Sequence, residues 1–167
     1  MKKNGITTKW KENVKAGPVI DDDNFFLNYA MHPYFGGVYY MTARSNGFTI
    51  LESFAYSAIM STFFWEYGVE AFAEIPSVQD LIVTPVLGSV VGEGFFDAKR
   101  SILKNDSKVL NSKFLGKTSL LLMDPLNTIM DSFGYKQKVK TQLNVAPVGF
   151  NPYTKSAILG LSFSASF

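Results

Sequence analysis

The side chains best suited to chemistry lie between residues 32 and 70. His32 is the only histidine in the chain, and it stands beside Pro33, where a helix is expected to break. Arg44 is the only Lys or Arg between residues 18 and 97, a stretch with ten acidic residues. Glu66 and Glu70 are four residues apart and share one helix stripe. Together His32, Arg44, Glu66 and Glu70 form a candidate catalytic cluster of a base, two carboxylates and an orienting cation.

The same residues also have structural interpretations. A histidine beside a helix break could act as a general base, but a lone histidine is more often a hydrogen-bonded structural residue. A buried Arg44 would pair with Glu66 or Glu70, because buried charges need partners. Whether the protein is an enzyme therefore stays open at this point.

A serine-hydrolase triad and a metal site are less well supported. Ser57 or Ser61 could join His32 and Asp80, but the chain has no Gly-x-Ser-x-Gly elbow. Asp80 is already explained as the third residue of a helix-capping box. Glu66, Glu70 and His32 lack the paired Glu-x-x-His elements of bundle di-metal sites, and Asp21–Asp23 precede no EF-hand loop. We therefore expect no metal and no cofactor.

The composition excludes several other classes of protein. The 167 residues suit one domain with an arm or tail, and zero cysteines exclude disulfides and thiolate metal sites. Residues 1–17 and 98–167 are basic and flank the acidic middle, which suggests two surfaces with different partners. The basic residues show no pattern of a nucleic-acid-binding module, so we expect no nucleic-acid partner.

The elements expected around the candidate site are mostly helices. Helix-start and helix-stop residues predict a helix after Asn24 that breaks at His32-Pro33, and a second helix over 34–45 ending at Asn46-Gly47. Capping boxes predict helices over 50–74 and 81–104, and Asp124-Pro125 begins a shorter one that ends at Gly134. These helices are too short or too charged to favour crossing a bilayer, so we expect them to pack internally or lie at an interface.

Small residues predict close contacts between the two long helices. Ser53, Ser57 and Ser61 form one ridge on the first of them. Gly88 and Gly92 form another ridge on the second. Such spacing lets helices approach closely, so the two ridges are expected to face each other.

The C-terminal segment changes to a period of two, which predicts two strands. Residues 139–145 alternate, and after a turn near Gly149 the odd residues from Ala157 to Phe167 are apolar. A last strand that ends on phenylalanine resembles the C-terminal assembly signal of outer-membrane barrels. Two strands cannot close a barrel. The hairpin is therefore expected to cover the core, pair with a partner sheet or join an oligomer.

Several sequence motifs occur together and in order. They are NYAMHPYFGGVYY (28–40), ARSNG (43–47), STFFWEYGVE (61–70), PSVQDLIVTP (76–85) and Gly92-Glu93. With these motifs, the stretch from Trp10 to Asp131 resembles an uncharacterised family of Gram-negative envelope proteins, the domain of unknown function 3943. The resemblance implies an envelope location and supplies no established reaction.

These observations predict a mainly α fold with a small β element, a compact multi-helix domain with closely packed small-residue helices and a C-terminal antiparallel β-hairpin. We expect a basic N-terminal arm (1–17), a helical domain (18–135) and an amphipathic β-hairpin (136–167). The segment 1–17 lacks the apolar core of a signal peptide. The expected location is the periplasmic side of the outer membrane.

The expected function is an interaction or structural role at that membrane, with outer-membrane lipid or an outer-membrane protein as partner and an oligomer as a further option. Alternatives are a lipid- or glycolipid-modifying enzyme and an accessory subunit docked on a larger barrel. Membrane or partner contact is expected at Trp10, Leu159, Leu161, Phe163 and Phe167.

Overall fold

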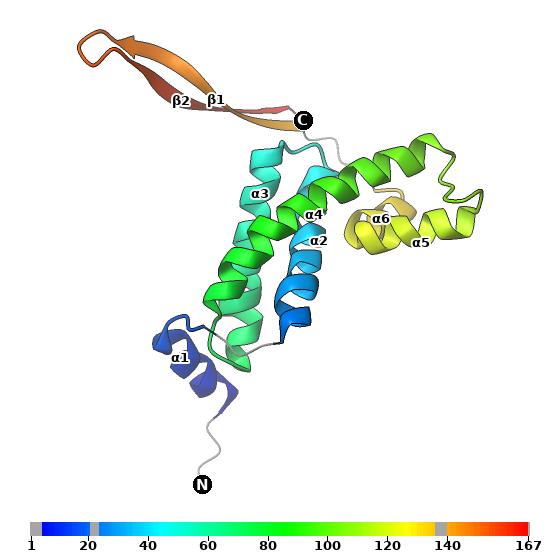
Figure 1. Cartoon of the computed structure of the whole chain (residues 1–167), viewed down its shortest axis with the longest axis horizontal. Coiled ribbons are helices and arrows are strands. Elements are labelled where there is room, and N and C mark those ends of the chain that lie inside the picture. The colour runs from blue at the N-terminus through cyan, green and yellow to red at the C-terminus, as the bar shows by residue number, and fades with distance from the viewer. Residues whose placement is uncertain (1–4, 21–23, 136–139, 167) are drawn as a thin grey trace.

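The computed structural model describes residues 5–20, 24–135 and 140–166, and it confirms the mainly helical fold with a C-terminal hairpin (Figure 1). The elements in chain order are α1 (Ile6–Ala16), η1 (Leu27–Met31), α2 (His32–Arg44), α3 (Ile50–Ile59), η2 (Met60–Val69), η3 (Glu70–Phe72), α4 (Val78–Lys104), α5 (Lys113–Met123), α6 (Pro125–Ser132), β1 (Lys140–Asn151) and β2 (Ser156–Ser166).

Helices α2 and α4 form the central contact of the helical layer. They lie so close that a Cβ atom on Gly88 would be 2.5 Å from the Cα atom of Gly36. A Cβ atom on Gly92 would be 2.6 Å from the ring of Tyr40. The glycine ridge therefore packs on α2, and the expectation that it faces the serine ridge is wrong. Ser57 of the serine ridge instead donates a hydrogen bond to the Gly36 carbonyl, also on α2.

The helix boundaries agree well with the capping residues. Thr49 and Glu52 form both hydrogen bonds of a capping box at the start of α3, and α4 begins after Ser77, whose hydroxyl accepts the Asp80 N–H. Gly47 and Gly134 have φ angles of +91° and +75°, which suits their places after α2 and α6. These local signals fixed the ends of the elements correctly.

The helix does not break at His32-Pro33 as the sequence suggested. A wide π turn, η1, runs directly into α2, with Pro33 in its first turn. Proline clashes with the carbonyl four residues earlier in a regular α-helix, and it has no N–H to donate. The π turn relieves both constraints, because the preceding hydrogen bond runs from the His32 N–H to the Leu27 carbonyl.

The N-terminal basic segment contains a helix, α1, which its interpretation as an arm did not anticipate. The Trp10 indole N–H donates to the Tyr67 carbonyl at 2.7 Å, so this side chain docks on its own chain, and its expected contact with a membrane or partner stays a prediction. The Asn13 amide donates to the Ala71 carbonyl at 2.9 Å. Helix α1 is thus held on the end of η2 and on η3.

A buried polar network joins α2, α4 and α6. Asp124 is fully buried, and its Oδ2 atom accepts hydrogen bonds from Lys99 Nζ at 2.7 Å and from Ser45 Oγ at 2.5 Å. The Asn127 amide donates to Asp124 Oδ1 at 2.8 Å. Asp124 stands at the N-cap position of α6, but its side chain makes no capping hydrogen bond and instead ties three helices together.

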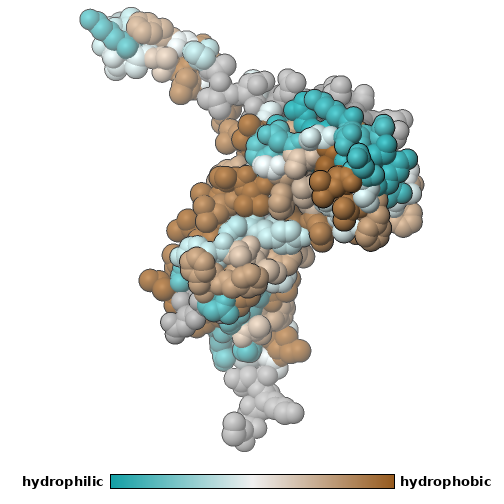
Figure 2. All heavy atoms as spheres, turned by 45° about the vertical axis from the view of Figure 1, so that its right-hand side comes forward, coloured by the Kyte–Doolittle hydropathy of each residue, from teal (hydrophilic) through white to brown (hydrophobic). Residues whose placement is uncertain are grey.

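The polarity of the helical layer is reversed relative to a soluble protein. Among the described residues, more polar than apolar side chains are buried; the polar ones are Asn28, Glu52, Ser53, Ser57, Ser61, Glu66, Ser77, Asp80, Thr84, Asp124 and Asn127. Large apolar side chains face outward, including Phe63 (68% exposed) and Val90 (71% exposed). Figure 2 shows this apolar surface over the middle of the helical layer.

The hairpin extends away from the helices (Figure 1), so the expectation that it covers the core is wrong. Strands β1 and β2 pair antiparallel from Lys140–Ser166 to Asn151–Ser156, with an irregularity between Pro147 and Gly149. Leu159 and Leu161 are exposed. Phe167 and the side chain of Phe163 lie outside the described part of the structure.

The α2–α4 contact predicts a sharp difference between two glycines of α4. Gly88→Ala places a methyl group against the Gly36 backbone, and we expect it to lower stability by about 1–3 kcal/mol. Gly94→Ala meets nothing within 4 Å and should stabilise the helix slightly, by about 0.5–1 kcal/mol. Thermal unfolding of the detergent-purified variants measures both effects, and equal melting temperatures would contradict the contact.

Candidate functional site

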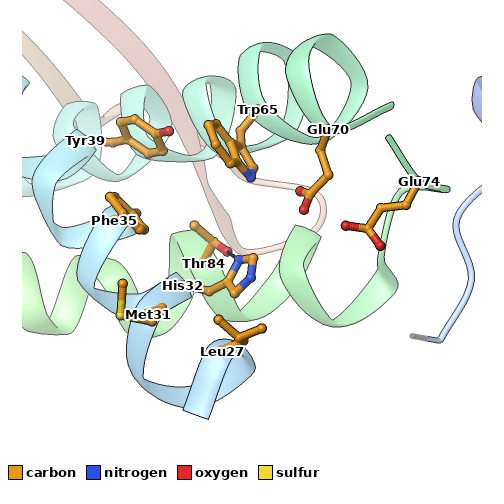
Figure 3. A pocket seen from close by; sticks show the side chains of 9 residues that line it. All are labelled: Leu27, Met31, His32, Phe35, Tyr39, Trp65, Glu70, Glu74 and Thr84. Atoms are coloured by element: carbon orange, nitrogen blue, oxygen red, sulfur yellow. Dashed lines mark hydrogen bonds between the residues drawn. The ribbon is translucent and has the colours of Figure 1, made fainter. Parts of the chain in front are cut away.

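A cavity of about 530 Å³ opens between α2, η2 and the first turns of α4. Its walls are mainly apolar, with polar groups at one end (Figure 3). The lining residues are Leu27, Met31, His32, Phe35, Tyr39, Trp65, Glu70, Glu74 and Thr84. A site of this size, apolar with a few convergent polar groups, is typical of a small-molecule pocket.

His32 lies at the start of α2, where the π turn aims its ring at α4. Its Nδ1 atom is 3.2 Å from Asp80 Oδ1 and 3.3 Å from Thr84 Oγ1. Asp80 and Thr84 are four residues apart, so they present their side chains on the same face of α4. A carboxylate at Nδ1 favours the tautomer with the hydrogen there, which leaves the lone pair on Nε2 to accept a proton.

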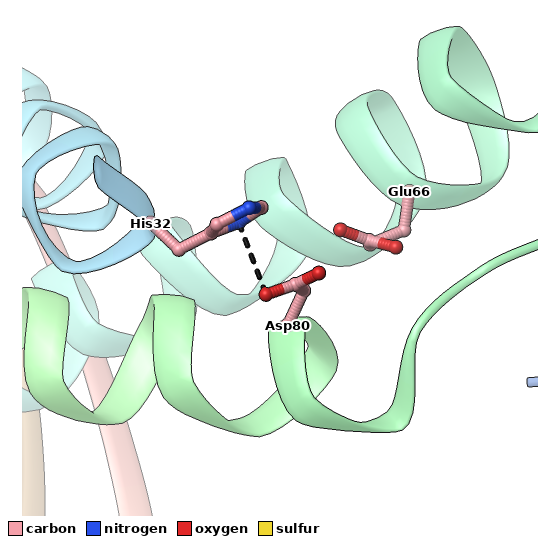
Figure 4. Close-up of side chains that lie close together, drawn as sticks. All are labelled: His32, Glu66 and Asp80. Carbon is pink, nitrogen blue, oxygen red and sulfur yellow. Dashed lines mark ion pairs between the residues drawn. The ribbon is translucent and has the colours of Figure 1, made fainter. Parts of the chain in front are cut away.

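Glu66 completes a group that we call the polar triad: His32, Glu66 and Asp80. One nitrogen or oxygen from each residue lies within 4.8 Å of the other two (Figure 4). Glu66 is 1% exposed and Asp80 2% exposed. Glu66 Oε2 accepts the backbone N–H of Ser77 at 3.1 Å, which fixes the carboxyl group against the start of α4.

The triad has unusual electrostatics because its carboxyl groups are buried close together. The pKa of Glu66 is raised to about 8, chiefly by burial; the Ser77 N–H opposes the rise, and Glu70 and Asp80 add to it. Burial also raises the pKa of Tyr39 on the cavity wall, and Glu70 acts in the same direction. At neutral pH, Glu66 thus favours its protonated form, next to a histidine that can accept a proton.

Arg44 lies apart from this cavity. Its Nε and Nη2 atoms contact the two carboxylate oxygens of Glu93 at 3.0 and 3.2 Å, and Nη1 donates to the Phe48 carbonyl. Tyr40 donates a short hydrogen bond to the same carboxylate. The expected pairing of Arg44 with Glu66 or Glu70 is therefore wrong. This fork of two hydrogen bonds lowers the pKa of Glu93.

The candidate residues thus divide into two groups. His32 and Glu66 belong to the triad, and Glu70 lines the cavity beside it, with a buried Oε2 atom that has no hydrogen-bond partner in the described part of the chain. Arg44 belongs to a separate ion pair. A catalytic role for the four residues stays a prediction.

Comparison with known families gives one match. Residues 17–126 match the model of the family described as Domain of unknown function (DUF3943), which is more than half of the chain. The chain belongs to this family. Neither the curated proteins nor the solved structures contain a match to it.

Within this DUF3943 domain, sequence reasoning missed Thr84 as a site residue. It paired Asp80 with His32 only in a serine-hydrolase triad and set it aside as a capping residue. The capping role of Asp80 is real, because its N–H donates to Ser77 Oγ at 3.2 Å. That role involves only its backbone, which leaves the side chain available for His32. The spacing of Asp80 and Thr84 on one helix face was the signal that could have found them.

The raised pKa of Glu66 gives the DUF3943 domain a predicted pH dependence. The folded protein holds this proton more tightly than the unfolded chain, whose ordinary value is 4.5. The proton therefore makes its full contribution to the free energy of unfolding below about pH 4.5. This contribution is lost as the pH rises towards 8, and the free energy of unfolding falls by at most about 1.4 kcal/mol per pH unit. Glu66→Gln should flatten this decline.

Melting temperatures of the purified protein at about pH 5 and about pH 8 measure the effect. Asp97→Asn, which removes an exposed carboxylate from α4, is the control and should keep the slope of the unmodified protein. An equal slope in Glu66→Gln would show that Glu66 is not the responsible group.

Proposed function

We propose that this protein is a membrane-associated component of the Gram-negative cell envelope that binds outer-membrane lipid through the apolar exterior of its helices. Its role is interaction or structural, on the periplasmic side of the outer membrane. The observation that carries the proposal is the reversed polarity of the helical layer, with serine, threonine and carboxyl side chains inside and large apolar side chains outside.

The apolar exterior is too extensive for a protein surrounded by water. Soluble monomers rarely expose contiguous apolar patches larger than a few hundred Å². Here every long helical element contributes to the exposed apolar surface, for example Phe63 and Phe64 on η2, Val90 on α4 and Phe114 on α5. By length and composition alone, α4 could also cross a membrane. In a lipid environment, this apolar surface would not be in contact with water, so its exposure would carry no unfavourable free energy of hydration.

The interior supports the same proposal. In lipid, helices gain little from burying apolar groups against each other, and they associate through small residues and hydrogen bonds. The contact of Gly36 with Gly88 and the Ser57 hydrogen bond to Gly36 are interactions of this kind. The outer membrane is favoured over other membranes by the hairpin, because apolar and small or polar residues alternate along β2, as they do along strands of outer-membrane barrels.

Flotation with lipid vesicles tests the proposal. The full-length protein should float with phosphatidylethanolamine–phosphatidylglycerol vesicles, with or without lipopolysaccharide. Each large apolar side chain removed from water is worth about 1.5–3 kcal/mol. The double variant Phe63→Ser, Val90→Ser should therefore float at least about tenfold less.

Leu110→Ser is the matched control, because Leu110 is 87% exposed but lies in the turn between α4 and α5. It should float like the unmodified protein. A protein that stays monomeric and soluble without detergent and does not float would overturn the proposal. Capture by a barrel protein through the open edges of β1 and β2 would instead favour the accessory-subunit alternative.

A second candidate function is a lipid- or glycolipid-modifying enzyme, and the cavity favours it. Figure 3 shows Met31 and Phe35 on one side of the cavity and Glu70 and Glu74 on the other, with His32 between them. This arrangement suits a molecule with an acyl chain and a polar head. His32, oriented by Asp80, would act there as the proton acceptor.

Lipid analysis of bacterial strains tests this candidate. If the cavity is catalytic, His32→Ala should reproduce the lipid changes of a gene deletion, at equal protein level. Arg44→Lys should leave the lipids unchanged, because Arg44 forms an ion pair with Glu93 and lies away from the cavity. Unchanged lipids in both the deletion and the His32→Ala strain would remove the enzyme from consideration.

A further inference from the structure

The polar triad has the composition and spacing of a metal site. We propose that His32, Glu66 and Asp80 bind one divalent transition-metal ion of the zinc, iron or manganese group at the polar end of the cavity. This inference goes beyond membrane association and does not depend on it. It also revises the expectation of no metal, which considered Glu66, Glu70 and His32 but not Asp80.

The three donors come from three different elements and point towards one another (Figure 4). His32 Nδ1 and Asp80 Oδ1 are 3.2 Å apart. Two donors that lie about 2.1 Å from one ion are separated by this distance when the angle between them is about 100°, close to tetrahedral or octahedral values. An ion between His32 and Asp80 would bind the Nδ1 lone pair, with the ring hydrogen moved to Nε2. All three donors lie within 4.8 Å of one another, so a small rotation of one carboxyl group brings the set onto one ion.

The chemistry of the donors selects the class of metal. One imidazole and two carboxylates suit zinc, ferrous iron or manganese, whereas calcium and magnesium prefer oxygen ligands throughout. The chain has no cysteine, which removes thiolate-dependent sites from consideration. Three protein ligands leave at least one coordination position open, as in catalytic metal sites.

The surroundings hold the donors as outer-shell groups do in metal sites. The Ser77 N–H fixes Glu66 Oε2 at 3.1 Å. Such partners orient ligands and are part of most metal sites. His32 belongs to both the triad and the cavity lining, so the open position would face the cavity.

Charge balance also favours a cation. Glu66 and Asp80 are almost completely buried, and buried carboxyl groups need a proton, a cation or both. A divalent ion supplies positive charge to both carboxyl groups at once.

Metal titration of the full-length protein in detergent tests the proposal. After chelation and dialysis, the protein should bind one Zn²⁺ per chain, measured by calorimetry and by elemental analysis. His32→Ala, Glu66→Gln and Asp80→Asn should each weaken binding at least about tenfold. Glu74→Gln is the control, because Glu74 lines the same cavity but is not in the triad. It should bind like the unmodified protein.

Spectroscopy of the unmodified protein covers the case in which a variant does not fold. Bound Co²⁺ should show visible absorption bands of a site with nitrogen and oxygen ligands, and X-ray absorption of the zinc form should show one imidazole. Less than stoichiometric binding by the unmodified protein, or equal binding by a folded triad variant, overturns the proposal. Binding by the detergent-solubilised protein is independent of flotation, so this test and the membrane test can fail separately.

Discussion

The contact between the backbones of α2 and α4 determines most of the structure. Gly36 and Gly88 have no side chains, and only for that reason can the two helices lie against each other. His32 stands one turn before Gly36, and Thr84 stands one turn before Gly88. The glycine contact therefore brings the histidine ring within 3.3 Å of the Thr84 hydroxyl. Asp80, one turn earlier on α4, becomes the next neighbour of the ring. The site is a direct consequence of the helix packing.

The reversed polarity follows from the same packing. Helices that approach this closely bury small residues. Gly88 lies against Gly36, Ser57 of α3 bonds to the Gly36 carbonyl, and large side chains point outward. In water this arrangement would lose the hydrophobic contribution that normally stabilises a helical domain. In lipid it loses nothing, because the exterior is already in an apolar solvent. Close helix contacts and an apolar exterior are thus two aspects of one sequence property.

The sequence predicted the ends of the elements better than their mutual arrangement. Thr49 with Glu52, Gly47, Gly134 and the period-two alternation are local signals, and each was confirmed. The predicted partner of Arg44 was wrong because the prediction used only the spacing of Glu66 and Glu70 along one helix. That spacing places both residues on one stripe but does not say which neighbouring helix the stripe faces. The pairing of the small-residue ridges was wrong for the same reason. Asp80 was set aside because its capping role already explained its presence.

The π turns explain why the triad could not be inferred from regular helix geometry. His32 directly follows η1, and Glu66 lies within η2, so both side chains are turned away from the positions that an α-helix would give them. Each π turn replaces the normal hydrogen-bond pattern with a wider one that is less common and is frequently found at functional sites. At η1, Pro33 accounts for the change. At η2 the segment Met60–Val69 contains no proline, so its geometry must be held by tertiary contacts. The Ser77 N–H bond to Glu66 and the Trp10 bond to the Tyr67 carbonyl are two such contacts. The irregular backbone and the buried carboxyl group therefore stabilise each other, at the place where the structure concentrates its ionisable side chains.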